Sequence, residues 1–522
     1  MALDILIKNG IVVDGVGTPS YHADIGIKNG KIKKIGFLGN PNATTVIDAT
    51  GQYVAPGFID INNASDRHWA LFNHPSMESL LYQGVTTIIG GNCGSSLAPL
   101  TTGNIIASIQ KWADIKQINV NWSTLTEFFE ELKRKKPLLN FGTLIGHATL
   151  RRNIVGDRFN ELTEKELGQV IHLLNEAIKQ GALGFSTGLV YSHAKVADAR
   201  EINSLISAMG PSKMYSTHLR NEEEKLYESI METIDIAKKT KANIEISHLK
   251  SVGKNNWSLF DKSLEAIEKA AEEGININFD IYPYTSTATI FYTMLPDWMA
   301  VGGRAKLIEN LKNPDLIKKA IEEMRGREED FSNSIIASGN IDTTFIGKTL
   351  GAISKNQGKG ILETVINILL VAEGKLIVFW PSISEENIIK ALKSNISIVA
   401  SDGPTYNLAD AKDGYLSHPR SFGCFPKILS RYVREKNIIS LEEAIKKMTA
   451  LPALKAGLPY RGIIRQGFFA DITIFNQNTI KDIASFENPF QYAQGINSVI
   501  INGQVALLKG EIKNLGLGYI LK

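Results

Sequence analysis

The chain has 522 residues, of which 43% are hydrophobic and 21% are charged, as is usual for a folded globular protein. Its 57 basic and 54 acidic residues leave a net charge of +3, so we expect neither nucleic acid nor a membrane surface as a partner. Two cysteines exclude a disulfide framework. No segment has the pattern of a signal peptide or a membrane helix, so we expect a cytoplasmic protein.

Both ends of the chain have the pattern of short β-strands. Apolar residues alternate with polar ones, and Asn-Gly or Gly-Asn pairs punctuate them, which is typical of hairpins. The segments are 4–15, 23–36 and 44–57 at one end, and 471–476 and 498–512 at the other. We therefore predict that residues 1–56 and 460–522 together form one small β-sandwich domain.

Strands and helices alternate between these two ends, which predicts a parallel sheet. The predicted strands are 55–61, 85–90, 139–146, 182–185, 214–218, 243–248, 276–282 and 396–401. Eight such strands predict a TIM (β/α)8 barrel over 57–459, with an insertion at about 285–375 between the seventh and eighth strands. An open doubly wound sheet is the alternative, although no G-x-G-x-x-G follows the first strand.

Four possible metal or acid–base residues stand at the ends of predicted strands: Cys93, His218, His248 and Asp402. Because the active site of a barrel lies at the carboxyl ends of its strands, these side chains are expected to converge. One thiolate and two imidazoles suit Zn²⁺ and leave a fourth position for water, beside which Asp402 can act as a base. Each residue taken alone is more often structural, so the convergence carries this prediction.

The order of motifs along nearly the whole chain resembles the N-acyl-D-amino-acid deacylases of the amidohydrolase superfamily. These motifs are APGFID, YQGVTTIIGGNCGSSLAPL, LIGHATLR, GALGFSTGLVYSHA, STHLRNE, ISHLKSVGKNNW, FDIYPYTST, SDGP, HPRSFGCFP, SLEEAIKKMTALPA and RGIIRQGFFADITIF. The resemblance implies a TIM barrel, zinc, and hydrolysis of the amide of an N-acyl-D-amino acid to a carboxylate and a free D-amino acid. It also implies that Cys93, His218 and His248 are metal ligands.

The same resemblance implies roles for further residues. Asp402 matches the general base, and Arg420 matches the residue expected to hold the substrate carboxylate. Tyr191, Lys250 and Tyr282 match positions that line the substrate pocket. A structural ion pair at Arg420, and simple packing at the two tyrosines, are the alternative interpretations.

One motif departs from the family pattern. Members carry His-x-His directly after the first strand, within GFIDxHxH, whereas this chain has Asn62 and Ala64 at those two positions. Alanine cannot bind a metal, and a neutral amide is a poor zinc ligand. We interpret His68, four residues further on, as a surface or helix residue. Because the Cys93, His218 and His248 set is intact, we predict one zinc ion per chain.

Three functional hypotheses follow. The first is a one-zinc N-acyl-D-amino-acid deacylase, and the second is another amidohydrolase that acts on a cyclic amide. The third is a non-catalytic relative, which the missing His-x-His favours and the intact remaining motifs disfavour. The preferred D-amino acid, the preferred acyl group and the oligomeric state do not follow from the sequence.

Overall fold

The computed structural model describes residues 2–101, 118–156 and 158–522. Its centre is an eight-stranded parallel sheet in which each strand pairs with the next one along the chain. The strands are β6 (Phe58–Asp60), β7 (Val85–Gly90), β8 (Asn140–Gly146), β9 (Gly184–Gly188), β10 (Met214–His218), β11 (Asn243–Ile246), β12 (Ile277–Ile281) and β16 (Ser397–Val399). All eight predicted strands are therefore present, and their bounds differ from the predicted ones by a few residues.

The first and last strands meet through the residues that follow them. The Asp402 amide donates to the Asn62 carbonyl at 2.9 Å, and the Ala64 amide donates to the Gly403 carbonyl at 3.1 Å. These bonds bring the two edges of the sheet together as a nearly closed barrel. The alternative of an open doubly wound sheet is wrong, because that fold reverses its strand order at a switch point and this sheet does not.

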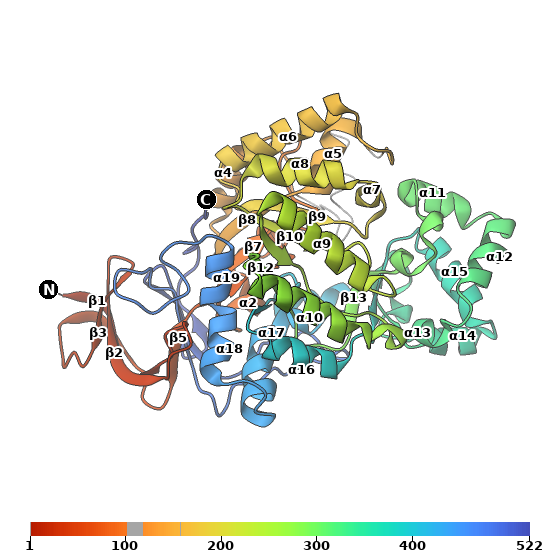
Figure 1. Cartoon of the computed structure of the whole chain (residues 1–522). Coiled ribbons are helices and arrows are strands. Elements are labelled where there is room, and N and C mark those ends of the chain that lie inside the picture. The colour runs from red at the N-terminus through yellow and green to blue at the C-terminus, as the bar shows by residue number, and fades with distance from the viewer. Residues whose placement is uncertain (1, 102–117, 157) are drawn as a thin grey trace.

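Helices surround the barrel, as Figure 1 shows. The larger ones are α4 (Leu125–Lys135), α5 (His147–Val155), α6 (Glu164–Lys179), α8 (Ala199–Met209), α9 (Leu226–Thr240), α10 (Leu259–Glu272), α16 (Glu385–Lys393), α17 (Arg420–Lys427) and α18 (Leu441–Met448). Shorter ones are α1 (Ala70–Asn73), α2 (Glu78–Leu81), α7 (Ser192–Lys195) and α19 (Ala450–Lys455). In α6, Leu167, Val170 and Leu174 form one buried stripe, as expected for an amphipathic helix.

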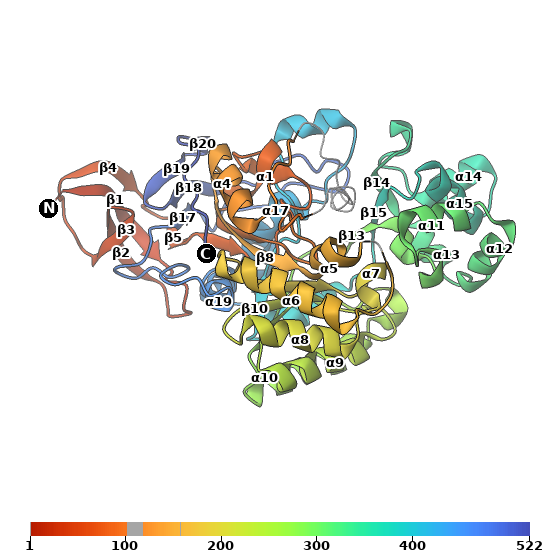
Figure 2. The ribbon, with the colours of Figure 1, turned by 90° about the horizontal axis from the view of Figure 1, so that it is seen from above.

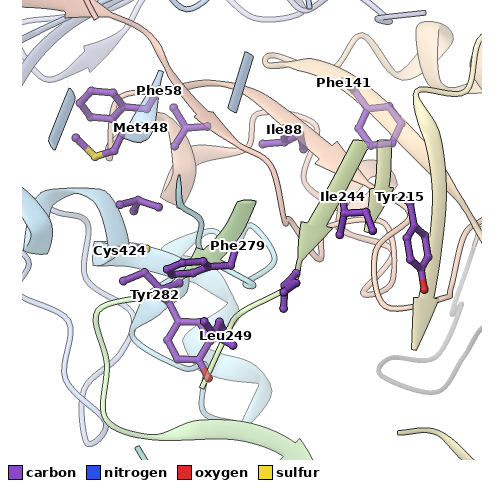
Figure 3. Close-up of a cluster of buried hydrophobic side chains, with 14 of the residues drawn as sticks. Phe58, Ile88, Phe141, Tyr215, Ile244, Leu249, Phe279, Tyr282, Cys424 and Met448 are labelled. Atoms are coloured by element: carbon purple, nitrogen blue, oxygen red, sulfur yellow. The ribbon is translucent and has the colours of Figure 1, made fainter. Parts of the chain in front are cut away.

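The main hydrophobic core lies between the strands and these helices. It contains outward-facing strand residues such as Ile88, Phe141, Tyr215 and Phe279, which Figure 3 shows among their neighbours. Since these side chains are almost fully buried, the barrel is a rigid support for the loops at its ends.

The two chain ends form one separate sheet of nine strands. These are β1 (Leu3–Val12), β2 (Tyr21–Lys28), β3 (Lys31–Gly36), β4 (Ala43–Asp48), β5 (Tyr53–Pro56), β17 (Ile472–Phe475), β18 (Ile496–Ile501), β19 (Gln504–Leu508) and β20 (Glu511–Ile512). The antiparallel pairing of β5 with β17 joins the two ends, as predicted. In Figures 1 and 2 this sheet lies on the opposite side of the barrel from α11–α15.

The segment between β12 and β16 contains the predicted insertion. It has a three-stranded sheet of β13 (Thr287–Ile290), β14 (Ile335–Gly339) and β15 (Leu376–Trp380). Its helices are α11 (Gly303–Asn310), α12 (Pro314–Glu323), α13 (Glu328–Ser332), α14 (Leu350–Gln357) and α15 (Ile361–Val371). A hydrophobic cluster around Leu307, Phe331 and Val378 is distinct from the barrel core. Among the described residues, no helix is long and apolar enough to cross a membrane.

Candidate active site

Three predicted metal ligands meet at the carboxyl ends of three barrel strands. Cys93 follows β7, His218 ends β10 and His248 follows β11, and one ligand atom from each lies within 4.8 Å of the others. The Cys93 Sγ is 3.5 Å from the His248 Nε2. The Nδ1 of His218 is buried and has no hydrogen-bond partner among the described residues. A thiol, two imidazoles and an unsatisfied ring nitrogen fit the ligand set of a zinc ion.

The backbone at this site adopts a conformation that is uncommon for residues other than glycine. Cys93 has φ of 52°, His248 has 38° and Asp402 has 47°. Such left-handed residues cost on the order of 1–3 kcal/mol each and cluster at functional sites. The His248 amide donates to Asp280 Oδ1 at 2.9 Å, which helps to fix one of these turns.

Glu222 and Lys250 support the two histidines. The two oxygens of Glu222 lie 3.5 Å from His218 Nε2 and 3.2 Å from His248 Nδ1, which leaves His218 Nδ1 and His248 Nε2 for a metal. Lys250 Nζ lies 2.6 Å from Glu222 Oε1 and 2.8 Å from His248 Nδ1. Burial alone would raise the pKa of Glu222, but Lys250 and the two histidines lower it well below its ordinary value. Glu222 is thus a carboxylate that orients both imidazoles.

Asp402, the predicted base, lies between two arginines. Its Oδ2 is 2.9 Å from Arg420 Nη1 and its Oδ1 is 3.2 Å from Arg67 Nη2. Burial would raise the pKa of Asp402, but Arg420, His248 and Arg67 together hold it well below its ordinary value. The Arg420 guanidinium also lies 4.7 Å above the Tyr282 ring.

The loop after β6, which contains Asn62 and Ala64, lies at the same site. Ala64 lines the cavity, and the Asn62 side chain donates from Nδ2 to Asp280 Oδ2 at 3.2 Å. His68 also lines the cavity, is half-buried and lies in a turn, so its interpretation as a surface or helix residue was wrong. Burial and the nearby Arg67 and Arg420 lower the pKa of His68 to about 3. Among the described residues, the Cys93, His218 and His248 group is the only cluster of three or more such side chains within ligand distance, and it excludes His68.

One cavity of about 300 Å³ contains the entire site. The residues around it include all eight that the sequence singled out: Cys93, Tyr191, His218, His248, Lys250, Tyr282, Asp402 and Arg420. The insertion contributes another part of the wall, with Thr287, Met294, Arg327 and Trp380. An ion pair between Lys195 and Asp297 joins α7 to the insertion beside this cavity. The volume suits a small molecule.

Sequence reasoning missed two charged residues here, Arg67 and Glu222. Glu222 had a usable signal, because it follows a predicted metal ligand, His218, by four residues in a loop at the active end of the barrel. Arg67 had none, because its partner Asp402 lies 335 residues further along the chain.

The chain is similar to known proteins in both sequence and structure. Residues 408–507 match the amidohydrolase family, and residues 1–55 match the N-terminal domain of the urease alpha-subunit. The D-aminoacylase of Alcaligenes xylosoxydans xylosoxydans is 30% identical over 503 residues, which are 96% of this chain and 93% of that protein.

Two solved structures match over the whole length of both chains. The N-acyl-D-glutamate deacylase of Bordetella bronchiseptica, complexed with zinc and a phosphonate that mimics the tetrahedral intermediate, has a TM-score of 0.85 at 28% identity. A D-aminoacylase with a binuclear metal centre, in which one metal activates and the second attenuates, has a TM-score of 0.83 at 28% identity. This chain therefore belongs to the D-aminoacylase family of amidohydrolases and is a hydrolase that acts on amide bonds.

Proposed function

We propose that the protein hydrolyses N-acyl-D-amino acids to a carboxylate and a free D-amino acid, with one zinc ion held by Cys93, His218 and His248. The proposal rests on one observation: this ligand set and the Asp402–Arg420 pair line the same cavity. The relative whose second metal attenuates its centre supports activity with one metal. When bound, zinc would supply Lewis-acid chemistry at the scissile amide.

Arg420 is placed to recognise the substrate. It is buried and pairs with Asp402, so a substrate carboxylate competes with Asp402 for the guanidinium. Transfer of Arg420 to the substrate removes one of the charges that lower the pKa of Asp402. The base therefore becomes stronger when substrate is bound.

Asp402 then serves both proton transfers. It takes a proton from the attacking water and delivers it to the nitrogen of the breaking C–N bond. The second transfer is necessary because an amine anion leaves poorly. Tyr191, Lys250 and Tyr282 line the pocket around the substrate in this proposal, and Lys250 also holds Glu222 against the histidines.

Hydrolysis of paired D and L substrates tests the proposal. We expect turnover of N-acetyl-D-amino acids, none of their L enantiomers, and a fall in kcat of roughly 10²- to 10⁴-fold in Asp402→Asn, because that variant lacks the base. The zinc content of this variant should be unchanged. Equal activity of Asp402→Asn and wild type would refute the mechanism. Turnover of a hydantoin but not of the linear amides would favour a cyclic-amide hydrolase.

A further inference from the structure

The loop after β6 carries a buried cation close to where the family motif has metal ligands. Three residues after Ala64, Arg67 enters the cavity wall and is only 5% exposed. Ala64 and Cys93 line the same cavity. Asn62 and Ala64 bring no charge to the cavity, but the same loop places the positively charged Arg67 guanidinium there.

Hydrogen bonds fix this loop to the two neighbouring strand ends. On one side, Asp66 accepts from the Gly91 amide at 2.6 Å and from the Arg67 amide at 2.8 Å. On the other side, the Asn63 side chain donates to the Gly403 carbonyl at 2.9 Å. Because the loop is held from both sides, the guanidinium is placed before substrate arrives, as electrostatic catalysis requires.

Arg67 is permanently charged, and its guanidinium faces Asp402, the proposed base. Its Nη2 lies 3.2 Å from Asp402 Oδ1, on the side of the carboxylate opposite to Arg420. Burial would lower the pKa of Arg67, but the nearby Cys93 and Asp402 raise it. An arginine side chain cannot lose its proton at working pH, and its several N–H groups can serve Asp402 and a substrate oxygen together.

We propose that the Arg67 guanidinium takes the place of a second metal ion. It stabilises the negative charge that develops on the carbonyl oxygen of the scissile amide. This inference rests on the proposed deacylase function. It also accounts for a single zinc ion, because Asn62 and Ala64 supply no ligands for a second ion and the guanidinium repels one. Arg67 is therefore a catalytic residue of the proposed reaction.

Kinetics of Arg67→Ala and Arg67→Lys test this role. Loss of one donor to an oxyanion costs roughly 10²- to 10³-fold in kcat, so we expect a fall of this size in Arg67→Ala with little change in KM, and a smaller fall in Arg67→Lys. Guanidinium added to Arg67→Ala should restore activity saturably, whereas neutral urea should not. Arg200→Met on α8, which removes a partly exposed ion pair with Glu164 on α6, is the matched control and should behave as wild type.

Zinc titration gives a second readout that does not depend on activity. Wild type in excess zinc should bind about one ion, and a second ion should bind only to the variant N62H/A64H/R67A. Two zinc ions on wild type, or an unchanged kcat in Arg67→Ala while wild type is active, would overturn the inference. If wild type has no deacylase activity, the proposed function fails, and the titration still decides whether Arg67 occupies the second cation position.

Discussion

Arg420 contacts Asp402, the proposed base, directly. Its electrostatic effect on Asp402 can therefore be measured apart from any effect on packing. Arg420 lowers the pKa of Asp402, and the base must be ionised to work. Activity is therefore lost as pH falls through the pKa of Asp402, and removal of Arg420 raises that pKa. We predict that Arg420→Met raises KM and moves the acid limb of the kcat/KM profile to higher pH than in wild type.

The control for this prediction is Arg420→Lys, which keeps the charge and should move the acid limb less. The pH dependence of kcat/KM for one N-acetyl-D-amino acid measures both variants. An acid limb that stays in place in Arg420→Met would show that Arg420 does not act on Asp402.

At the residue scale, the sequence predicted the positions that carry a motif and missed those defined only by the fold. Cys93, His218, His248 and Asp402 each end or follow a recognisable strand, so their convergence was predictable. Arg67 lies in the loop after the first barrel strand, and its partner Asp402 follows the last strand, 335 residues further along the chain. No local pattern can reveal such a contact.

Among the helices, the contact between α5 and α8 contains a buried ionic cluster. Glu201 on α8 lies 2.7 Å from His147 Nε2 and also pairs with Arg151 Nη1 at 2.5 Å, and all three side chains are at most 1% exposed. Burial alone would raise the pKa of Glu201, but His147 and Arg151 lower it below its ordinary value. The ionised carboxylate thus holds the two helices together.

We predict that Glu201→Gln lowers the free energy of unfolding by about 3–5 kcal/mol, because it leaves the buried Arg151 without a counter-charge. Since the folded pKa of Glu201 is lowered, its stabilising effect is present above the ordinary value of 4.5 and is lost as pH falls below it. Denaturant titration at several pH values measures both effects. Glu164→Gln, at the partly exposed pair with Arg200, should change stability by less than about 1 kcal/mol. Equal effects of the two substitutions would contradict this account.

Strands were predicted well where both faces are buried and poorly where polar residues face a site. β9 was placed at 182–185 but is Gly184–Gly188, because its second half contains Ser186 and Thr187. Both hydroxyls are hydrogen-bonded, since Ser186 Oγ accepts from the Gly94 amide at 3.0 Å and Thr187 Oγ1 lies 2.8 Å from the hydroxyl of the outward-facing Tyr215. In the insertion, β15 is an uninterrupted apolar run, whereas β13 contains two threonines and β14 contains a serine and a glycine, so their strand patterns are weaker.

In the whole molecule, Asn140 joins the sheet of the chain ends to the barrel. From β8, its Oδ1 accepts from Asn502 Nδ2 at 2.8 Å and from the Tyr519 amide at 2.9 Å. Hairpin patterns predict that the two chain ends pair in one sheet. They do not predict how that sheet attaches to the barrel. It depends on side chains separated by hundreds of residues.

We predict that Asn140→Ala lowers the free energy of unfolding by about 1–3 kcal/mol, because it removes the acceptor of the buried Asn502 side chain and of the part-buried Tyr519 amide. Thermal unfolding measures the change. Asn514→Ala, which removes an exposed hydrogen bond to the Val505 carbonyl, is the matched control and should have little effect. If both substitutions were neutral, the bonds of Asn140 would not couple the two parts of the molecule.

The proposed function depends on a single zinc site made by Cys93, His218 and His248, in a chain that carries Asn62 and Ala64 after its first barrel strand. Elemental analysis of the purified protein, beside the Cys93→Ala variant, tests it most directly. We predict about one zinc ion per chain in wild type, and its loss in Cys93→Ala while the variant remains folded. No bound zinc in wild type, two ions per chain, or zinc retained in the variant would contradict the account.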